Sequence, residues 1–258
     1  MVYKKGPPYK VRPVEEICEE IREAGKAYGK KAKSVFFPAC NTIAMPTDDL
    51  AAICRFAVES FYLLQRITVY GSSQYVARKG LTVLKTHRES GLSRIHVGLE
   101  SGDDLILRKV KKGTTASEQI KAGRMAKEAG IELSEYVILG LGGTERSEAH
   151  AKETAKAINA IEPDFLRLRT LVAKINTLLL HEINKGRFKL LSPHQVLQET
   201  KLLIENTRCR TFLTSDHYTN YLDLAGRLPE DKERLLVKID QALSWDESRF
   251  RPCFIGSQ

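Results

Sequence analysis

The sequence predicts an α/β fold, built as a partial (β/α) barrel of the TIM type. Helical and strand patterns alternate along most of the 258 residues, and such alternation produces parallel βαβ units. The expected strands are short, continuous apolar runs, which is typical of parallel strands that are covered on both faces. Hydrophobic residues make up 42% of the chain and charged residues 28%, as in an ordinary globular domain.

The apolar runs predict five strands, at about residues 34–38, 66–70, 94–99, 133–139 and 164–171. The first of them, Ser34-Val35-Phe36-Phe37, is expected to be a buried strand. Two helix starts match the capping-box pattern, Thr115 with Glu118 and Ser192 with Gln195. We therefore expect a barrel domain over residues 1–190, and a helical C-terminal extension over residues 191–258 that packs on the barrel.

Charge and cysteine content narrow the class of protein. The net charge of +9 is compatible with a nucleic acid, an anionic membrane surface or a phosphorylated substrate. The basic residues are spread along the helices without interleaved aromatic residues, which favours a solvated surface. No apolar run approaches the roughly 20 residues of a membrane span, so no membrane partner is expected. The five cysteines are Cys18, Cys40, Cys54, Cys209 and Cys253. Their odd number and wide spacing predict a reducing cytoplasm and no metal site.

Candidate functional residues lie where the predicted strands end, because parallel barrels bind their ligands at that edge. Glu100 follows an apolar strand and lies between Gly98 and Gly102, where a carboxylate can bind a ribose diol or an ammonium group. Ser101 adds a hydroxyl group there. An alternative interpretation of this segment is a solvated helix cap.

A second strand exit is the glycine-rich run Gly140-Leu141-Gly142-Gly143, whose backbone a ligand can approach closely. A plain strand-to-helix turn is the alternative for this run. Farther along, Ser215-Asp216-His217 suggests acid–base chemistry or a loop that closes the barrel mouth. The sequence assigns no catalytic residue.

Taken together, several segments resemble the core domain of the radical S-adenosylmethionine (radical SAM) superfamily, in the group of oxygen-independent coproporphyrinogen oxidase, Elongator-type enzymes and methylthiotransferases. The resemblance covers nearly the whole chain. The segments that carry it are Phe37 to Thr47, Val97-Gly98-Leu99-Glu100-Ser101-Gly102, Lys112-Gly113-Thr114-Thr115, Ala129-Gly130-Ile131 and Val137-Ile138-Leu139-Gly140-Leu141-Gly142-Gly143.

This resemblance implies an enzyme that binds a [4Fe–4S] cluster and reductively cleaves SAM to a 5′-deoxyadenosyl radical. It also implies an electron donor such as ferredoxin or flavodoxin, and a small-molecule or RNA substrate of unknown identity. By resemblance, Glu100 and Ser101, next to Gly98, contact the SAM ribose or amino group. Gly140 and Leu141 lie under the adenine, and Arg124 contacts the SAM carboxylate.

The chain departs from this family at its first residues. The family carries its three cluster cysteines as CxxxCxxC after the first strand, whereas Met1-Val2-Tyr3-Lys4 stands at that junction here. We therefore expect that the first strand is missing, and that this chain holds no cluster and performs no radical chemistry. Two explanations stay open: a wrong start site or a shortened form of the protein, and gene decay or a binding-only pseudoenzyme.

A rival hypothesis is a barrel enzyme without a redox centre that acts on a phosphorylated substrate. It would use Lys112 and the turn at residues 140–143 to bind phosphate, and a closed barrel of eight strands would favour it. An RNA-binding module is a third hypothesis, which salt-dependent RNA binding would support.

Overall fold

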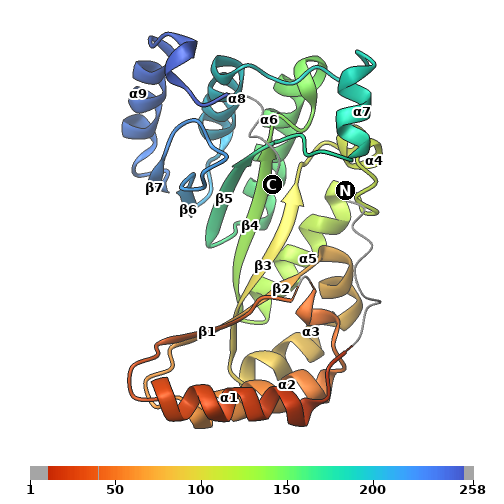
Figure 1. The fold of residues 1–258 in the computed structure, drawn as a ribbon, viewed down its shortest axis with the longest axis vertical. Coiled ribbons are helices and arrows are strands. Elements are labelled where there is room, and N and C mark those ends of the chain that lie inside the picture. The colour runs from red at the N-terminus through yellow and green to blue at the C-terminus, as the bar shows by residue number, and fades with distance from the viewer. Residues whose placement is uncertain (1–10, 40, 253–258) are drawn as a thin grey trace. The chain divides into compact units, whose positions relative to one another are not determined.

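The computed structural model describes residues 11–39 and 41–252. Seven strands of the described residues form one sheet in the order β1-β2-β3-β4-β5-β6-β7, which is not closed (Figure 1). β1 pairs with β2, β2 with β3 and β5 with β6 in parallel, whereas β6 and β7 are antiparallel. The strands are β1 (Ser34–Phe37), β2 (Arg66–Gly71), β3 (Leu92–Glu100), β4 (Glu132–Leu139), β5 (Phe165–Thr170), β6 (Thr211–Thr214) and β7 (Ala225–Leu228). The predicted α/β class is confirmed.

Helices occupy most of the connections between these strands. They are α1 (Val14–Tyr28), η1 (Thr42–Ala44), α2 (Thr47–Ser60), α3 (Ser73–Glu89), α4 (Asp104–Lys109), α5 (Ala116–Glu128), α6 (Gly143–Ile161), α7 (Leu178–Asn184), α8 (Pro193–Asn206), α9 (Lys232–Leu243) and η2 (Glu247–Arg249). Both predicted capping boxes are confirmed. The Thr115 N–H donates to Glu118 Oε2 at 2.8 Å, and the Ser192 N–H donates to Gln195 Oε1 at 2.9 Å.

The described residues fall into two compact units. The N-terminal unit holds residues 11–98 and 121–134, and the C-terminal unit holds residues 99–120 and 135–252. The N-terminal unit packs α2 against α1 and α3. Leu50, Ile53 and Cys54 recur at helical spacing on α2 and are buried, which explains why this amphipathic segment forms a helix. On its strands, the rings of Phe36, Tyr70 and His96 meet, with Phe36 and Tyr70 centroids 5.0 Å apart.

The C-terminal unit is built around β4 to β7. Helix α8 packs against α6 and α9, and α9 packs against β7 (Figure 1). The core of this unit includes Leu168, Ile158 and Leu213, each with no exposed surface. The amphipathic faces of the long helices thus cover apolar strands, as in other α/β proteins.

Two expectations need correction. The segment 191–258 is not only helical, because it contributes β6 and β7, and β6 extends the parallel sheet beside β5. The predicted buried strand at residues 34–37 is wrong in its burial, since Phe36 is 43% exposed. That strand is β1, which lies at one end of the described sheet and has a neighbour on one side only. The domain boundary near residue 190 stays a prediction.

Candidate functional site

The exit of β3 has an unusual backbone. Glu100 adopts a φ of 62°, which is rare for a residue with a side chain. Two residues later, a Cβ on Gly102 would stand 2.3 Å from the carbonyl oxygen of Glu153 on α6, so only glycine fits there. The Gly102 N–H donates to Thr154 Oγ1 at 2.9 Å. The motif Glu100-Ser101-Gly102 is therefore shaped by close contact with α6.

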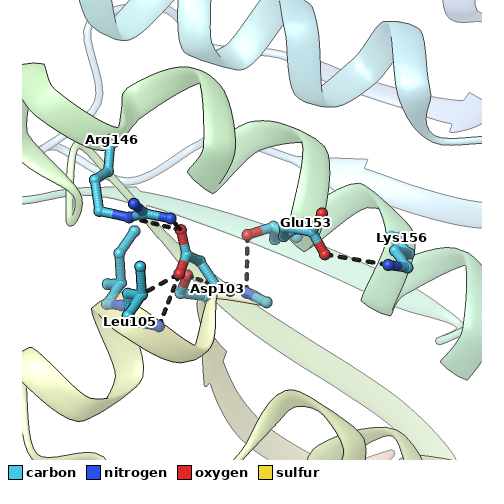
Figure 2. Close-up of polar contacts among 9 residues, drawn as sticks. Asp103, Leu105, Arg146, Glu153 and Lys156 are labelled. Atoms are coloured by element: carbon cyan, nitrogen blue, oxygen red, sulfur yellow. Dashed lines mark hydrogen bonds and ion pairs between the residues drawn. The ribbon is translucent and has the colours of Figure 1, made fainter.

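This turn is contacted by three residues of α6, Arg146, His150 and Thr154. They are spaced four apart in the sequence, as residues on one helix face are. Arg146 donates to Asp103 Oδ2 from Nε at 2.9 Å and from Nη2 at 2.6 Å (Figure 2). Asp103 also caps α4 by accepting from the Leu105 N–H at 2.8 Å. Burial alone would raise the pKa of Asp103, but these hydrogen bonds outweigh burial and lower its pKa. The Asp103 carboxylate is thus a fixed anion between the β3 exit and α6.

A buried histidine–glutamate pair connects the exits of β3 and β4. His150 Nδ1 lies 2.9 Å from Glu199 Oε1, and His150 Nε2 lies 3.3 Å from the carbonyl oxygen of Glu100. Glu199 Oε1 also accepts from the Gly140 N–H at 2.7 Å, and its Oε2 accepts from Ser147 Oγ at 2.5 Å. The two side chains are 1% and 0% exposed. One buried pair therefore fixes both strand ends.

Three ionisable groups, those of Glu100, Lys112 and Glu135, gather beside the β3 exit. Lys112 Nζ lies 3.0 Å from Glu100 Oε1, and both side chains are mostly buried. Glu135 on β4 is 1% exposed, and its Oε2 has no hydrogen-bond partner. Burial, followed by the charge of Glu100, raises the pKa of Glu135 to about 8. At neutral pH Glu135 is therefore mainly protonated, and Glu100 is the carboxylate available to a cation.

An apolar pocket opens beside Gly140. It is lined by Leu139, Gly140, Thr170, Leu171, Leu190, Leu191, Val196 and Tyr221. Gly140 has a φ of 78°, and a Cβ built there would approach Leu191 to 3.8 Å and Leu171 to 3.9 Å. The bare backbone of Gly140 thus forms part of the pocket wall.

The other predicted site residues lie in different surroundings. Gly98 belongs to the N-terminal unit, as does Arg124, which is an exposed residue of α5. Ser101 is fully buried, and its Oγ accepts from the Asp103 N–H at 3.0 Å. Leu141 is 9% exposed in the turn after β4. The structure thus brings Glu100 and Gly140 into one hydrogen-bonded network, while the ligand roles of all six residues stay predictions.

Sequence reasoning missed His150, Glu199 and Glu135. His150 and Glu199 are 49 residues apart, and each stands alone among helical residues. Glu135 is a charged residue type within the apolar run of β4. This is the one sequence feature that could have predicted a functional role for it. A charged residue inside a buried strand is costly unless it has a function or a partner.

The cysteines of the described residues do not fit a [4Fe–4S] cluster. The sequence has no CxxxCxxC motif, and among the described residues no group of three Cys, His, Asp or Glu side chains could hold a metal. Cys18 lies on α1, and Cys54 is a buried residue of α2. Burial raises the pKa of Cys54 to about 12, whereas a metal ligand must be a thiolate. Cys40 and Cys253 lie outside the described residues.

Largely parallel strands connected by helices define an α/β protein with a barrel-like sheet that is not closed among the described residues. The comparison with known families agrees. The family model described as the Radical SAM superfamily matches residues 1–158 of this chain. The chain therefore belongs to this superfamily.

Two similar proteins come from Methanocaldococcus jannaschii, and both are called uncharacterized. The first is 27% identical over 226 residues, covering 87% of this chain and 65% of the relative. The second is 23% identical over 228 residues, covering 81% of this chain and 41% of the relative. The chain therefore spans less than two thirds of the length of either relative.

Solved structures share the fold at low sequence identity. Archaeal Elp3 of Methanocaldococcus infernus has a TM-score of 0.59 at 15% identity over 89% of this chain and 59% of its own. Coproporphyrinogen III oxidase of Escherichia coli, a radical SAM enzyme, has a TM-score of 0.55 at 15% identity, and the match covers 75% of this chain and 46% of the oxidase. Methylornithine synthase has a TM-score of 0.54 at 18% identity, and the match covers 93% of this chain and 76% of the synthase. Among the described residues, no helix has the length and apolarity to cross a bilayer.

Proposed function

We propose that this chain is the SAM-binding core of a radical SAM enzyme, and that the exits of β3 and β4 bind the cofactor. Family membership implies SAM, a [4Fe–4S] cluster and a reductant. The observation that carries the proposal is the His150–Glu199 pair, which fixes Glu100 and Gly140 in one network. A binding site needs its groups held in place before the ligand arrives, and this pair does so.

Two parts of SAM have chemically suitable partners here. The apolar residues beside Gly140 would pack against the adenine ring, and a carboxylate at Glu100 suits the ammonium group or the ribose hydroxyls. Lys112 already contacts Glu100, so a cationic ligand would share that carboxylate with Lys112. When bound, SAM would supply the group that is cleaved in this family. The residues described here bind and orient it.

The cluster is a separate matter, because the cysteines of the described residues do not fit it. We propose that the chain alone binds SAM without assembling a cluster. Anaerobic reconstitution with iron and sulfide should then give no stable [4Fe–4S] absorption spectrum. A stable cluster on this chain would overturn that part of the proposal.

The phosphate-binding alternative has less support. The Gly140 N–H donates to Glu199, the Leu141 N–H to Ile138 O and the Gly143 N–H to Gly140 O. These donors therefore already have partners and are not directed toward a ligand. The described sheet is also not a closed barrel of eight strands.

Calorimetric titration of SAM into the purified chain tests the proposal. We expect saturable binding, weakened about tenfold or more by Glu100→Gln, because that change removes a charged hydrogen-bond acceptor. Gly140→Ala should also weaken binding, since its Cβ would enter the pocket wall. Glu233→Gln, an exposed carboxylate on α9, is the matched control and should bind as the parent chain does. The absence of saturable binding, or equal binding by Glu100→Gln and Glu233→Gln, would refute it.

A further inference from the structure

Two arginines project from one face of β5. Arg167 and Arg169 alternate along the strand with Leu166 and Leu168, which are fully buried. Since neighbouring side chains of a strand point to opposite faces, both guanidinium groups lie on the face opposite these leucines. Both arginines are only partly exposed. A pair of guanidinium groups on a partly covered face is a concentrated positive charge.

Arg167 lacks a hydrogen bond that its burial demands. Its Nε atom is buried and has no hydrogen-bond partner. Thr214 on β6 is the register partner of Arg167, and its buried Oγ1 has no partner either. Buried polar atoms are nearly always hydrogen bonded to protein or to ordered water, so two unpaired ones on register-paired residues mark a place where a ligand or water can bind. The Arg167 Nε–H group is a donor only and therefore lacks an acceptor, and the Thr214 hydroxyl is able to donate to the same acceptor.

Arg169 extends the positive charge toward the loop after β6. Its guanidinium lies over the Tyr136 ring at 5.1 Å, and its Nη1 is 3.8 Å from Asp216 Oδ1. Asp216 is 57% exposed and is too far away for a hydrogen bond. Arg169 Nη1 also donates to Leu168 O at 3.0 Å, so Arg169 is oriented by stacking and by this hydrogen bond, while its charge is incompletely neutralised.

His217 adds a neutral ring beside Arg169. Its Nδ1 lies 2.7 Å from Thr219 Oγ1 and 3.3 Å from the Thr219 N, so this nitrogen is occupied by Thr219. Burial, and then the charge of Arg169, lower the pKa of His217 against the opposing effect of Asp216. The ring is therefore neutral at pH 7 and adds no charge beside Arg169.

We propose that Arg167, Arg169 and Thr214 form a binding site for an oxyanion, the carboxylate or phosphate group of a substrate. A guanidinium fork binds two oxygens of such a group at once, and the threonine hydroxyl donates to a third position or to one of these. None of these residues belongs to the proposed SAM site.

The position of the arginines connects this site to the proposed function. Arg169 is followed by Thr170, which lines the pocket at Gly140. Thr170 Oγ1 also donates to Asn220 Oδ1 at 3.1 Å, which holds the loop containing His217 against the end of β5. That the bound anion belongs to a substrate rests on the proposed SAM site, whereas anion binding itself does not.

Anion titration of the chain without SAM tests the site. Inorganic phosphate is added in one arm and acetate in the other at constant ionic strength, while the Arg Nε–H signals are followed by NMR. We expect the Arg167 signal to shift saturably with at least one of the two anions. Arg167→Gln should weaken binding about tenfold or more, since a charged hydrogen bond is lost. Thr214→Val should weaken it less.

Matched variants separate binding from folding. Arg210→Gln removes an arginine whose side chain is 88% exposed and should leave anion binding unchanged. Arg167→Lys keeps the charge without the fork, and it should retain weaker binding if Arg167→Gln fails to fold. Preference for phosphate or for acetate identifies the group and supports the site in either case. The absence of a saturable shift with either anion, or an equal loss of anion binding in Arg210→Gln, would overturn the proposed anion site. If the same protein still binds SAM, the SAM proposal stands separately.

Discussion

The strand exits of the two units are held by different kinds of interaction. In the N-terminal unit, the turn after β1 relies on neutral groups: Asn41 Oδ1 accepts from the Ser72 N–H at 3.0 Å, and Thr42 Oγ1 donates to Phe37 O at 3.2 Å. In the C-terminal unit, the exits of β3 and β4 rely on the buried pair of His150 and Glu199.

The proposed cofactor site rests on this difference. Neutral hydrogen bonds are sufficient to close a turn, whereas burying charged groups carries a desolvation penalty that apolar packing would avoid. Functional sites accept such penalties because fixed charges recognise ligands. Buried polar atoms without a partner occur in both units, at His87 in the N-terminal unit and at Glu135 and Arg167 in the C-terminal unit. The support for the proposed site is therefore the buried pair that joins the β3 and β4 exits, and not unpaired groups alone.

Removing Glu199 should have the largest effect on stability. Glu199→Ala leaves the Gly140 N–H, Ser147 and His150 without their buried acceptor, so we expect a loss of about 3 kcal/mol or more in the free energy of unfolding. Asn41→Ala, at the neutral strand exit, should lose only about 1 kcal/mol. Urea denaturation of both variants measures the two values. Equal losses would remove the contrast between the two units.

The second-largest effect is expected in the pH dependence of the free energy of unfolding, which should include the ionisation of Glu135. Its folded pKa of about 8 lies above the ordinary glutamate value of 4.5, so the folded state binds the proton more tightly. Its contribution to stability is full below about pH 4.5 and is lost as pH rises to about 8, by about 1 kcal/mol for each pH unit. Glu135→Gln should lack this dependence, and its advantage over the parent chain should grow from pH 6 to pH 8. Parallel curves would show that Glu135 ionises normally.

His87 in the N-terminal unit should give the opposite trend. Burial, and then the charge of Lys79, lower its pKa from 6.5 to about 4. The folded state therefore binds this proton less tightly, and stability should fall as pH drops from about 6.5 to about 4, by about 1 kcal/mol for each unit. His87→Leu should remove this loss in urea denaturation at pH 5. If the variant keeps the same acid sensitivity, His87 is not its source.

The smallest effect is expected at Asp103 and Arg146. Arg146→Gln breaks a hydrogen-bonded pair in which Asp103 is 4% exposed but Arg146 is 36% exposed, so we expect a loss of about 1 kcal/mol. Arg210→Gln breaks a pair whose arginine is 88% exposed, and it should change stability by nearly nothing. Thermal denaturation compares the two variants. A larger loss from Arg210→Gln would contradict the importance given to burial.

Local sequence patterns predicted much of the fold and part of the site. Capping boxes and apolar runs depend on residues close in sequence, and both capping boxes and all five predicted strands are present. Strand β6 was missed because its four residues, Thr211 to Thr214, contain only two apolar residues, which is too short a run to predict a strand. Glu100 and Gly140 stood out by their position after strands. Their connection through His150 and Glu199 depends on packing between α6 and α8, which no local pattern reveals.

The most direct test of the account is a SAM titration of the chain labelled with ¹⁵N-glycine. The account predicts that the backbone signals of Gly140 and Gly142, at the β4 exit, shift saturably. Those of Gly25 and Gly29 in the N-terminal unit should stay in place. Glu199→Gln, which removes the charge that fixes Gly140, should weaken the response. Shifts confined to Gly25 and Gly29, or no shift at saturating SAM, would contradict the claim that the charged strand ends form the cofactor site.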